Sequence, residues 1–562
     1  MFFLYGGFVF LCSLGIIEIL VKRIGIMEKI AKFIDNILCK KIEPAFWCLN
    51  FCGIISLRLY VDKFIAKSSS PLFDLIMDIH NLLFFFLTFS LIWLAMSIML
   101  RKKPFDLAYL MLLASLAIIF PPIFDLIRTG SEVFWSFYLI SAPIDLFWQY
   151  VTIFGHLPSG VFYFGTKIVF IAGIIVMTSL MAVKTKKLSR TILTAIGTYS
   201  ALFFMAAFPS LFYYLARFLE KKSIFSIYPF EIVQFFAKAQ LFGIGLSDPA
   251  YALAHNLNLI YFPISLAILS YFFWKSKSKM FWAVVRNLRY PQVIFHGGLL
   301  FLGLGMGLLV YPENFNPNLF SFLTVAVLLI SVLLAWEASV VVNDIFDYHV
   351  DMLSNPERPL QRGIFTFSQY AQFGVIMFFL SIIGGLLVQY KFGILLIVYQ
   401  IMAWFYSAEP FRLKRFTPIA SLLSALTLLT VFFSGFILFS PDQSIAGLSW
   451  RIIFLLLIAY MLSLPIKDFK DIKGDKRDGV RTIPVIFGEE KGRLIVASGI
   501  FISYVLSVFF INESRLFWWA IIFGSASFLI MINKKIHPRQ VFWWILAVVT
   551  FYGLLAVRII FF

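Results

Sequence analysis

Charged side chains are scarce in this chain, and their scarcity excludes a water-soluble globular protein. Of its 562 residues only 14% are charged whereas 61% are hydrophobic, and the mean hydropathy is +0.92. That much apolar surface exceeds what the interior of a soluble domain can bury. The composition therefore predicts an all-α, polytopic bundle of transmembrane helices.

Cysteine is nearly absent as well. The four cysteines, Cys12, Cys39, Cys48 and Cys52, have no histidine near them at zinc-finger spacing, so we expect neither a zinc site nor disulfides. The first 20 residues lack a basic leading segment and a small-residue cleavage site. We expect this run to be a membrane anchor that is kept in the protein.

The net charge of +18 does not indicate nucleic acid as a partner. Lys and Arg stand in short clusters between apolar runs and form no continuous basic face. Clusters of this kind are typical of loops that fix the orientation of a membrane protein. We therefore expect the lipid bilayer, and no nucleic acid, as a partner.

The second half of the chain contains nine apolar runs of the length that a bilayer requires. They lie near 291–311, 319–342, 368–388, 391–408, 417–439, 450–466, 493–511, 515–533 and 540–560. Basic residues are concentrated in every second connection, at 411–415, 467–493 and 533–539. The positive-inside rule places these connections, and an acidic segment at 343–351, on the cytoplasmic side of the membrane.

The first half is less regular. Its apolar runs lie near 1–20, 45–61, 80–100, 104–124, 132–154, 161–183, 191–215 and 251–274. Strict alternation puts one basic cluster on the wrong side, so we expect the run at 132–154, which contains Pro143, to be re-entrant, interfacial or split. The polar stretch near residue 280 predicts a boundary between a membrane domain at 1–280 and a second domain at 281–562.

Two acidic stretches share one spacing. In "NDIFDYHVD", Asp344, Asp347 and Asp351 are separated by three and then four residues, and in "KDFKDIKGD" the same spacing separates three further acids, Asp468, Asp471 and Asp475. On a helix such residues occupy one face. Both stretches begin at the predicted cytoplasmic end of a membrane helix, so the two acidic faces lie at one depth.

Two facing rows of carboxylates favour a shared Mg²⁺ ion, which prefers oxygen ligands and is often completed by a phosphate-bearing substrate. The alternative is that each stretch is a solvated turn whose acids pair with nearby Lys and Arg. Because the spacing occurs twice at one depth, we favour metal and diphosphate binding.

Further segments accompany the acidic ones: "NPERPLQRGIFT" (355–366), "YSAEPFRLKR" (406–415) and "GVRTIPVIFG" (479–488). Together these motifs resemble the UbiA superfamily of intramembrane prenyltransferases over about 281–562. The resemblance implies a nine-helix domain, here preceded by an additional multi-helix membrane domain. The segment "RPLQRG" departs from the family pattern, in which a proline usually stands near the glycine.

The resemblance also implies roles for individual residues. Asp344, Asp347, Asp351, Asp468, Asp471 and Asp475 would bind Mg²⁺, with Asn343 helping to hold the diphosphate of a polyprenyl donor. Arg358, Arg362, Lys414 and Lys467 would contact phosphate oxygens, and Tyr406 would contact the diphosphate or shield the allylic cation. Of these, Asp344, Asp347, Asp468, Asp471 and Tyr406 are the candidate catalytic residues.

The implied reaction is Mg²⁺-dependent transfer of the prenyl group to a membrane-associated acceptor, with release of diphosphate. The motifs look most like those of archaeal enzymes that prenylate a glycerophospholipid hydroxyl, and somewhat like chlorophyll and homogentisate prenyltransferases, so the acceptor is a lipid hydroxyl or an aromatic ring. The rival interpretation is a lipid-binding or transport protein that keeps the fold without turnover. Intact acids in both rows favour the enzyme.

Ionisable residues are scattered through the first half without a repeated spacing: Asp74, Asp78, His80, Asp125, Arg128, Asp145 and His156. We expect helix ends and ion pairs to account for them more readily than a second active site. This half would deliver the acceptor, modify it, or support the enzyme.

Overall fold

The computed structural model describes residues 26–65, 74–129, 139–152, 164–225, 227–237, 249–477 and 479–561. Within these ranges the regular structure is helical, apart from one isolated bridge between Phe416 and Arg481. Fourteen helices there are long and apolar enough to cross a membrane. The predicted all-α, multi-pass membrane protein is therefore confirmed, while the predicted anchor at 1–20, with Cys12, and His156 lie outside the described residues.

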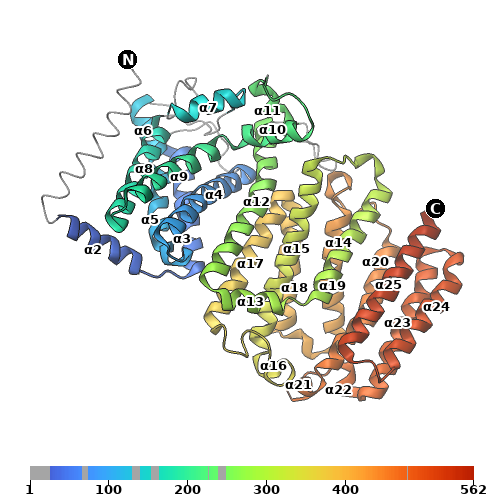
Figure 1. The fold of residues 1–562 in the computed structure, drawn as a ribbon. Helices are drawn as coiled ribbons and strands as arrows, with labels where there is room; N and C mark the ends of the chain where they lie inside the picture. Colours follow the sequence, from blue (N-terminus) through green and yellow to red (C-terminus); the bar gives the residue numbers. More distant parts are fainter. Residues whose placement is uncertain are drawn as a thin grey trace. The chain divides into compact units, whose positions relative to one another are not determined.

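The described chain divides into two compact units between Ser278 and Lys279. The first unit contains the following helices (Figure 1): α2 (Ile26–Cys39), α3 (Pro44–Tyr60) with η1 (Val61–Ile65), α4 (Leu75–Leu100), η2 (Pro104–Leu107), α5 (Ala108–Ser115), η3 (Leu116–Ile119), α6 (Phe120–Thr129), α7 (Pro143–Val151), α8 (Phe164–Thr185), α9 (Leu188–Ala206), α10 (Phe208–Leu219), α11 (Pro229–Ala237) and α12 (Pro249–Ser276).

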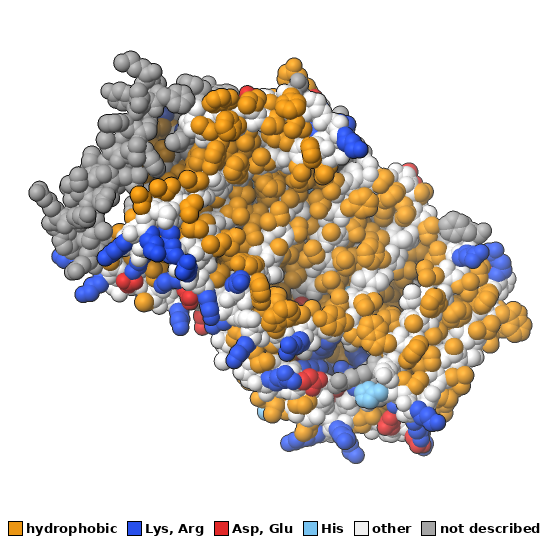
Figure 2. Space-filling model, viewed as in Figure 1, with side chains coloured by type: hydrophobic (Ala, Val, Ile, Leu, Met, Phe, Trp, Pro, Cys, Tyr) orange, Lys and Arg blue, Asp and Glu red, His pale blue; other side chains and the backbone are white. Residues whose placement is uncertain are grey.

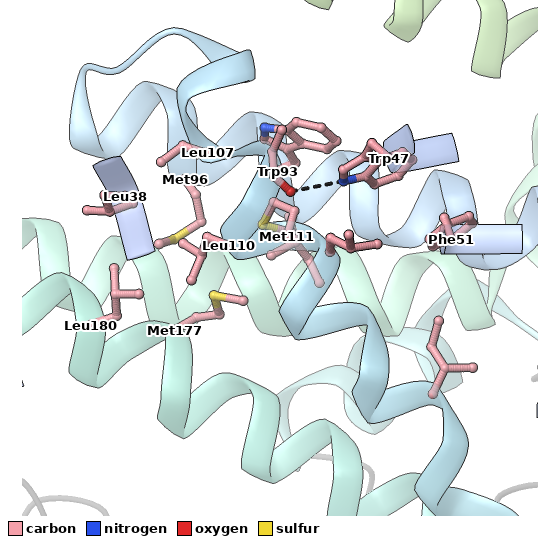
Figure 3. Packing of buried hydrophobic residues seen from close by; sticks show 14 of the residues in the cluster. Leu38, Trp47, Phe51, Trp93, Met96, Leu107, Leu110, Met111, Met177 and Leu180 are labelled. Atoms are coloured by element: carbon pink, nitrogen blue, oxygen red, sulfur yellow. Dashed lines mark hydrogen bonds between the residues drawn. The ribbon is translucent and has the colours of Figure 1, made fainter. Parts of the chain in front are cut away.

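Aliphatic side chains, with Trp, Phe and Met side chains among them, fill the core of this unit, as Figure 3 shows for residues from α2, α3, α4, α5 and α8. Trp47 stacks on Phe51 with ring centroids 5.1 Å apart, and its indole N–H donates to the carbonyl of Ala108 over 2.9 Å (Figure 3). The indole N–H of Trp93 donates to the carbonyl of Pro104 over 2.7 Å. Each buried indole thus has a hydrogen-bond acceptor, which removes the cost of burying its polar edge.

Two apolar runs of the first half are interrupted in the structure. The described part of the run at 132–154 forms only α7, whose nine residues are too few to span a bilayer. The run at 191–215 breaks after Ala206, and the separate helix α10 begins at Phe208 with Pro209 in its first turn. Proline suits the first turn of a helix, where its missing N–H leaves no hydrogen bond unmade.

Several ionisable residues of this unit have structural partners. Asp74 caps α4 by accepting from the backbone N–H of Met77 over 3.2 Å, and Asp78 pairs with Lys63 over 3.0 Å. His80 bonds Asn258 over 2.9 Å. These contacts join helices or close their ends, as expected for structural roles.

The second unit contains nine long helices among its described residues, with short helices at their ends (Figure 1). The long ones are α14 (Tyr290–Val310), α15 (Leu319–Phe346), α17 (Phe367–Val388), α18 (Tyr390–Ser407), α19 (Thr417–Phe436), α20 (Trp450–Ser463), α23 (Glu489–Ile511), α24 (Phe517–Ile532) and α25 (Pro538–Phe561). The short ones include α13 (Ser278–Asn287), α16 (Tyr348–Ser354), η7 (Leu464–Lys470), α21 (Ile472–Arg477) and α22 (Ile483–Phe487). Each long helix overlaps one of the nine predicted runs.

Glycine lets α14 and α19 approach each other closely. A Cβ atom on Gly303 would lie 2.1 Å from the carbonyl oxygen of Phe432, and one on Gly435 would lie 2.1 Å from that of Leu300. Lipid tails are as apolar as the helices, so close backbone packing is a main source of stability between them. The contact fixes α14, whose first turn lies at the candidate site.

Local sequence determines where the helices near the site begin. Asn318 caps α15 by accepting from the N–H of Ser321, and Thr366 forms a capping box with Gln369 at the start of α17. Pro465 lies in the first turn of η7. These signals fix the ends of the helices that carry polar residues.

Polar and apolar side chains separate on the surface of the second unit. On the face in Figure 2, hydrophobic side chains cover the sides of the long helices, whereas Lys and Arg gather at the end where α16, α21 and α22 lie. The acidic stretches of the sequence are at the same end. This end is therefore the polar rim of the unit.

Candidate active site

Each acidic stretch turns at its middle carboxylate. Helix α15 ends at Phe346, Asp347 has a non-helical ψ of 13°, and α16 begins at the next residue. In the second stretch η7 ends at Lys470, Asp471 has a ψ of 8°, and α21 follows. Neither acidic row therefore lies on one continuous helix.

The two short helices that follow these breaks pack on each other. Gly474 of α21 lies against α16, where an added Cβ would be 2.6 Å from Cγ1 of Val350 and 2.7 Å from Oγ of Ser354. The Asn355 amide at the end of α16 donates to Asp351 over 2.9 Å and to Asp471 over 3.3 Å. A glycine contact and a bridging amide thus hold the two acidic rows together.

Asp344 is fully buried and surrounded by donors. Its Oδ1 accepts from Arg289 over 2.6 Å and from Arg358 over 2.9 Å. Its Oδ2 accepts from the hydroxyl of Tyr370 over 3.0 Å and from the amide of Asn287 over 3.1 Å. A buried carboxylate needs this degree of compensation, since an unpaired one is strongly destabilising.

Asp347 and Asp351 also have cationic partners. Asp347 accepts from Lys414, from Arg412 over 3.2 Å and from the amide of Asn343 over 2.7 Å. Asp351 pairs with Arg358, which bridges it to Asp344. The first row is therefore interleaved with guanidinium and ammonium groups.

Lys467 and Tyr406 form a second cluster beside the acids. The Lys467 ammonium donates to the Tyr406 hydroxyl over 2.9 Å and lies 4.6 Å from the centre of its ring. It also donates to the hydroxyl of Ser424 over 3.4 Å. Tyr406 therefore presents both a polar tip and an aromatic face where a cation can be held.

Two acids outside the spanning segments have a raised pKa. Burial raises the pKa of Asp351 to about 6, although Arg358 opposes the effect. Burial, together with the carboxylates of Asp468 and Asp471, raises the pKa of Asp475 to about 8. A bound cation stabilises the ionised form of a carboxyl group whose pKa is raised in this way. It compensates both the desolvation of the carboxylate and the repulsion between like charges.

A cavity of about 240 Å³ joins these elements. Most of the predicted site residues line it: Asn343, Asp347, Asp351, Arg358, Tyr406, Lys414, Lys467, Asp468, Asp471 and Asp475. Asp344 lies behind the cavity wall, where it holds Arg289 and Arg358, and Arg362 is exposed in the segment after α16. The remaining wall is largely apolar and includes Phe295, Leu428 and Phe542.

Side chains that could hold a metal do not converge in a ready-made site: among the described residues there is no group of three or more His, Cys, Asp or Glu arranged to do so. The first row explains this, because Asp344, Asp347 and Asp351 point at Arg and Lys. Asp468 and Asp475 line the cavity without a side-chain ion pair in the described structure.

Sequence reasoning missed several site residues, of which Arg289 and Arg412 are the most important. Arg289 immediately precedes α14 within a basic segment that we attributed to the domain boundary. Arg412 belongs to the basic cluster "FRLKR", and we used this arginine only to orient the helices in the membrane. The packing of α14 and α18 against α15 brings these two arginines to the acids, and the sequence alone does not indicate this packing.

Comparison with known sequences finds a family model and several relatives that match this unit. A model described as the UbiA prenyltransferase family matches residues 298–552. The chain is 29% identical to the digeranylgeranylglyceryl phosphate synthase of Methanosphaera stadtmanae over 196 residues, covering 35% of this chain and 66% of that protein. It is 26% identical to the synthase of the same name from Natronomonas pharaonis over 227 residues, covering 40% and 75%. The first of these matches thus spans slightly less than two thirds of the relative's length.

Solved structures of similar chains align with about half of this one. A UbiA homologue from Archaeoglobus fulgidus bound to DMAPP and Mg²⁺ is 18% identical, with a TM-score of 0.39, and covers 49% of this chain and 99% of that chain. A structure from a study of digeranylgeranylglyceryl phosphate synthase in membranes is also 18% identical, with a TM-score of 0.35, and covers 49% and 96%.

Proposed function

We propose that this chain transfers a prenyl group from a polyprenyl diphosphate to a membrane-associated acceptor, because residues 298–552 match the model of the UbiA prenyltransferase family. The observation that carries the proposal is the cavity that joins both acidic rows, Arg and Lys side chains and an apolar wall. Such a cavity suits a substrate with a highly charged head and a hydrocarbon tail. It fits neither a soluble metabolite nor a wholly apolar lipid equally well.

The acids that line the cavity fit Mg²⁺. Asp347 and Asp351 from the first row and Asp468, Asp471 and Asp475 from the second supply only oxygen ligands, which Mg²⁺ prefers. When bound, the ion would neutralise charge on the diphosphate and so make it a better leaving group. We propose that these carboxylates hold the ion, and that the buried Asp344 orients one of them, Asp351, through Arg358.

The cations that now pair with the acids suit the phosphate oxygens. Arg358, Arg412 and Lys414 already donate to the carboxylate oxygens of Asp351 and Asp347 in the cavity, and phosphate oxygens accept the same charge-assisted hydrogen bonds. Lys467 is held at Tyr406, from where it can reach a phosphate without leaving the ring. We propose that these groups stabilise negative charge as it develops on the departing diphosphate.

The apolar wall suits the allylic cation that remains when the diphosphate departs. Aromatic faces attract a cation without attacking it, and the ring of Tyr406 lines the cavity. Burial among Phe295, Leu428 and Phe542 excludes water that would otherwise capture the allylic cation.

We propose a lipid hydroxyl as the acceptor in preference to an aromatic ring. The names of the relatives support this choice, since a digeranylgeranylglyceryl phosphate synthase attaches a prenyl group to a glyceryl phosphate lipid. We also propose that the polar rim faces the cytoplasm, as the basic connections predict. Residues 281–562 would form this enzyme domain, and residues 1–280 a separate membrane domain of unknown function.

The proposal is tested by diphosphate release from geranylgeranyl diphosphate in membranes that contain the full chain and Mg²⁺. Asp347→Ala and Asp471→Ala should each lower release by about 100-fold or more, because each removes an acid from the proposed ion site. Glu313→Ala is the matched control, since Glu313 is an exposed acid in the connection at the opposite end of α14. Release that is equal in the two Asp variants and the wild type would favour the non-catalytic, lipid-binding or transport interpretation.

A further inference from the structure

A second level of the cavity lies deeper along the same helices as the charged rim. On α14 His296 follows Arg289 by seven residues, on α15 Trp336 precedes Asn343 by seven, and on α18 Tyr399 precedes Tyr406 by seven. Seven residues are two helical turns, a rise of about 10 Å. All three side chains line the cavity, so His296, Trp336 and Tyr399 form a ring beneath the proposed diphosphate site.

The contacts of His296 fix its tautomer. Its Nδ1 lies 2.7 Å from the backbone carbonyl of Gln292, which can only accept, so Nδ1 carries a proton. In the neutral ring Nε2 is then the unprotonated nitrogen, and it lies 3.0 Å from the hydroxyl of Tyr399. Tyr399 therefore donates to His296, and the pair has the polarity of a general base with a bridging hydroxyl.

Trp336 completes this arrangement. Its ring stacks at an angle on His296 with centroids 4.6 Å apart. Within the described part of the chain its indole N–H has no hydrogen-bond acceptor, although it is shielded from solvent. An indole N–H can only donate, so it suits the oxygen of a hydroxyl-bearing molecule placed beside Tyr399.

We propose that the His296–Tyr399 pair accepts the proton of the acceptor's hydroxyl group. This proposal rests on the proposed prenyl transfer and identifies the acceptor as an alcohol. It also gives a role to two buried polar side chains that line the cavity, since His296 is 3% exposed and Tyr399 is 2% exposed. An alcohol is a weak nucleophile until its proton is removed, whereas the charged rim is occupied by groups that suit the diphosphate.

The step is balanced in atoms and charge. The bond between C1 of the prenyl group and the diphosphate oxygen breaks, and the electron pair leaves with the diphosphate. The acceptor oxygen forms an ether bond to C1 while its proton passes to the oxygen of Tyr399, whose own proton passes to Nε2 of His296. The imidazolium then returns its proton to the oxygen of Tyr399, whose hydroxyl proton passes to the departing diphosphate, and this restores the pair.

The role of the pair is tested by the ratio of prenylated lipid formed to diphosphate released. Membranes with the full chain are incubated with radiolabelled geranylgeranyl diphosphate and a native lipid extract, and both labelled lipid and released diphosphate are measured. In His296→Gln and Tyr399→Phe we expect the yield of labelled lipid per released diphosphate to fall about 100-fold. The missing label should appear as prenyl alcohol or diene.

Tyr504→Phe is the matched control. It also removes a buried tyrosine hydroxyl with a 3.0 Å hydrogen bond, here to Ser527, but it lies outside the cavity and should leave this ratio unchanged. The proposal would be overturned if both His296→Gln and Tyr399→Phe kept the wild-type ratio of labelled lipid to released diphosphate. It would also be overturned if diphosphate release and lipid labelling fell equally in variants whose thermal unfolding matches that of the control. Label on an aromatic carbon would overturn the choice of an alcohol. Failure of wild-type release would instead reject the proposed function itself.

Discussion

Substitution of Gly474 by alanine tests whether contact between α16 and α21 sets the geometry of the proposed metal site. The new Cβ would lie 2.6 Å from Cγ1 of Val350 and 2.7 Å from Oγ of Ser354, whereas ordinary contacts begin at 3.4 Å. Helix α21 must therefore withdraw from α16 by about 1 Å, or the two side chains must rotate away. The 3.3 Å hydrogen bond between Asn355 and Asp471 cannot survive such a withdrawal.

The expected magnitude follows from this displacement. Overpacking of this size costs about 1–3 kcal/mol, and a displacement of about 1 Å between reacting groups can cost about 100-fold in rate. Because Gly474 touches only the support of the two rows, every carboxylate is still present in Gly474→Ala. We therefore expect a lower maximal rate of diphosphate release together with a higher Mg²⁺ concentration at half-maximal rate.

The assay measures diphosphate release over a series of Mg²⁺ concentrations. Gly305→Ala is the control, since Gly305 is also helical but nothing lies within 4 Å of its added Cβ. Val350→Ala combined with Gly474→Ala should restore part of the activity, because it removes the atom in closest contact. A wild-type Mg²⁺ response in Gly474→Ala, or an equal change in the control, would refute the reasoning.

Three further predictions concern proton binding, the diphosphate and membrane packing. Because the pKa of Asp475 is raised to about 8, protons compete with Mg²⁺ for this carboxylate below that pH. The Mg²⁺ concentration at half-maximal diphosphate release should therefore fall as the pH rises through 8. Asp475→Asn should make this concentration less dependent on pH. Lys467→Met should raise the KM for the donor about tenfold, measured by release kinetics, while the Mg²⁺ response stays unchanged. Gly303→Ala places a Cβ 2.1 Å from the Phe432 carbonyl, so thermal unfolding in detergent should reveal a loss of about 1–3 kcal/mol.

The helices of the second unit could be predicted from sequence because their lengths are imposed by the bilayer. The run at 319–342 became α15 (Leu319–Phe346), and even α18 (Tyr390–Ser407), which falls short of the composition expected of a membrane span, was found from its apolar run. The family resemblance, which rested on several ordered motifs, is confirmed for residues 298–552. Length and ordered motifs are local properties of a sequence, and local properties are the ones that a single sequence records.

The partners of the acids could not be predicted in the same way. Spacing placed Asp344 with Asp347 and Asp351, but it did not indicate that Asp344 would be buried behind the cavity. Its partner Arg289 is 55 residues away and reaches it only because α14 and α15 pack together. The pair of His296 and Tyr399 spans 103 residues on two helices. Contacts between distant helices depend on packing, which hydrophobic periodicity does not specify.

The alternation of carboxylates with Arg and Lys in the cavity needs an explanation other than stability. A buried ion pair contributes little net stability, since the cost of removing both charges from water offsets their attraction. Asp347 with Lys414 and Asp351 with Arg358 are such pairs, and both line the cavity. In the proposed function each pair can separate without leaving an unpaired charge, because a divalent cation takes the carboxylate while a phosphate takes the Arg or Lys. Either ligand alone would leave half of the charges uncompensated, so the arrangement favours entry of the cation and the diphosphate together.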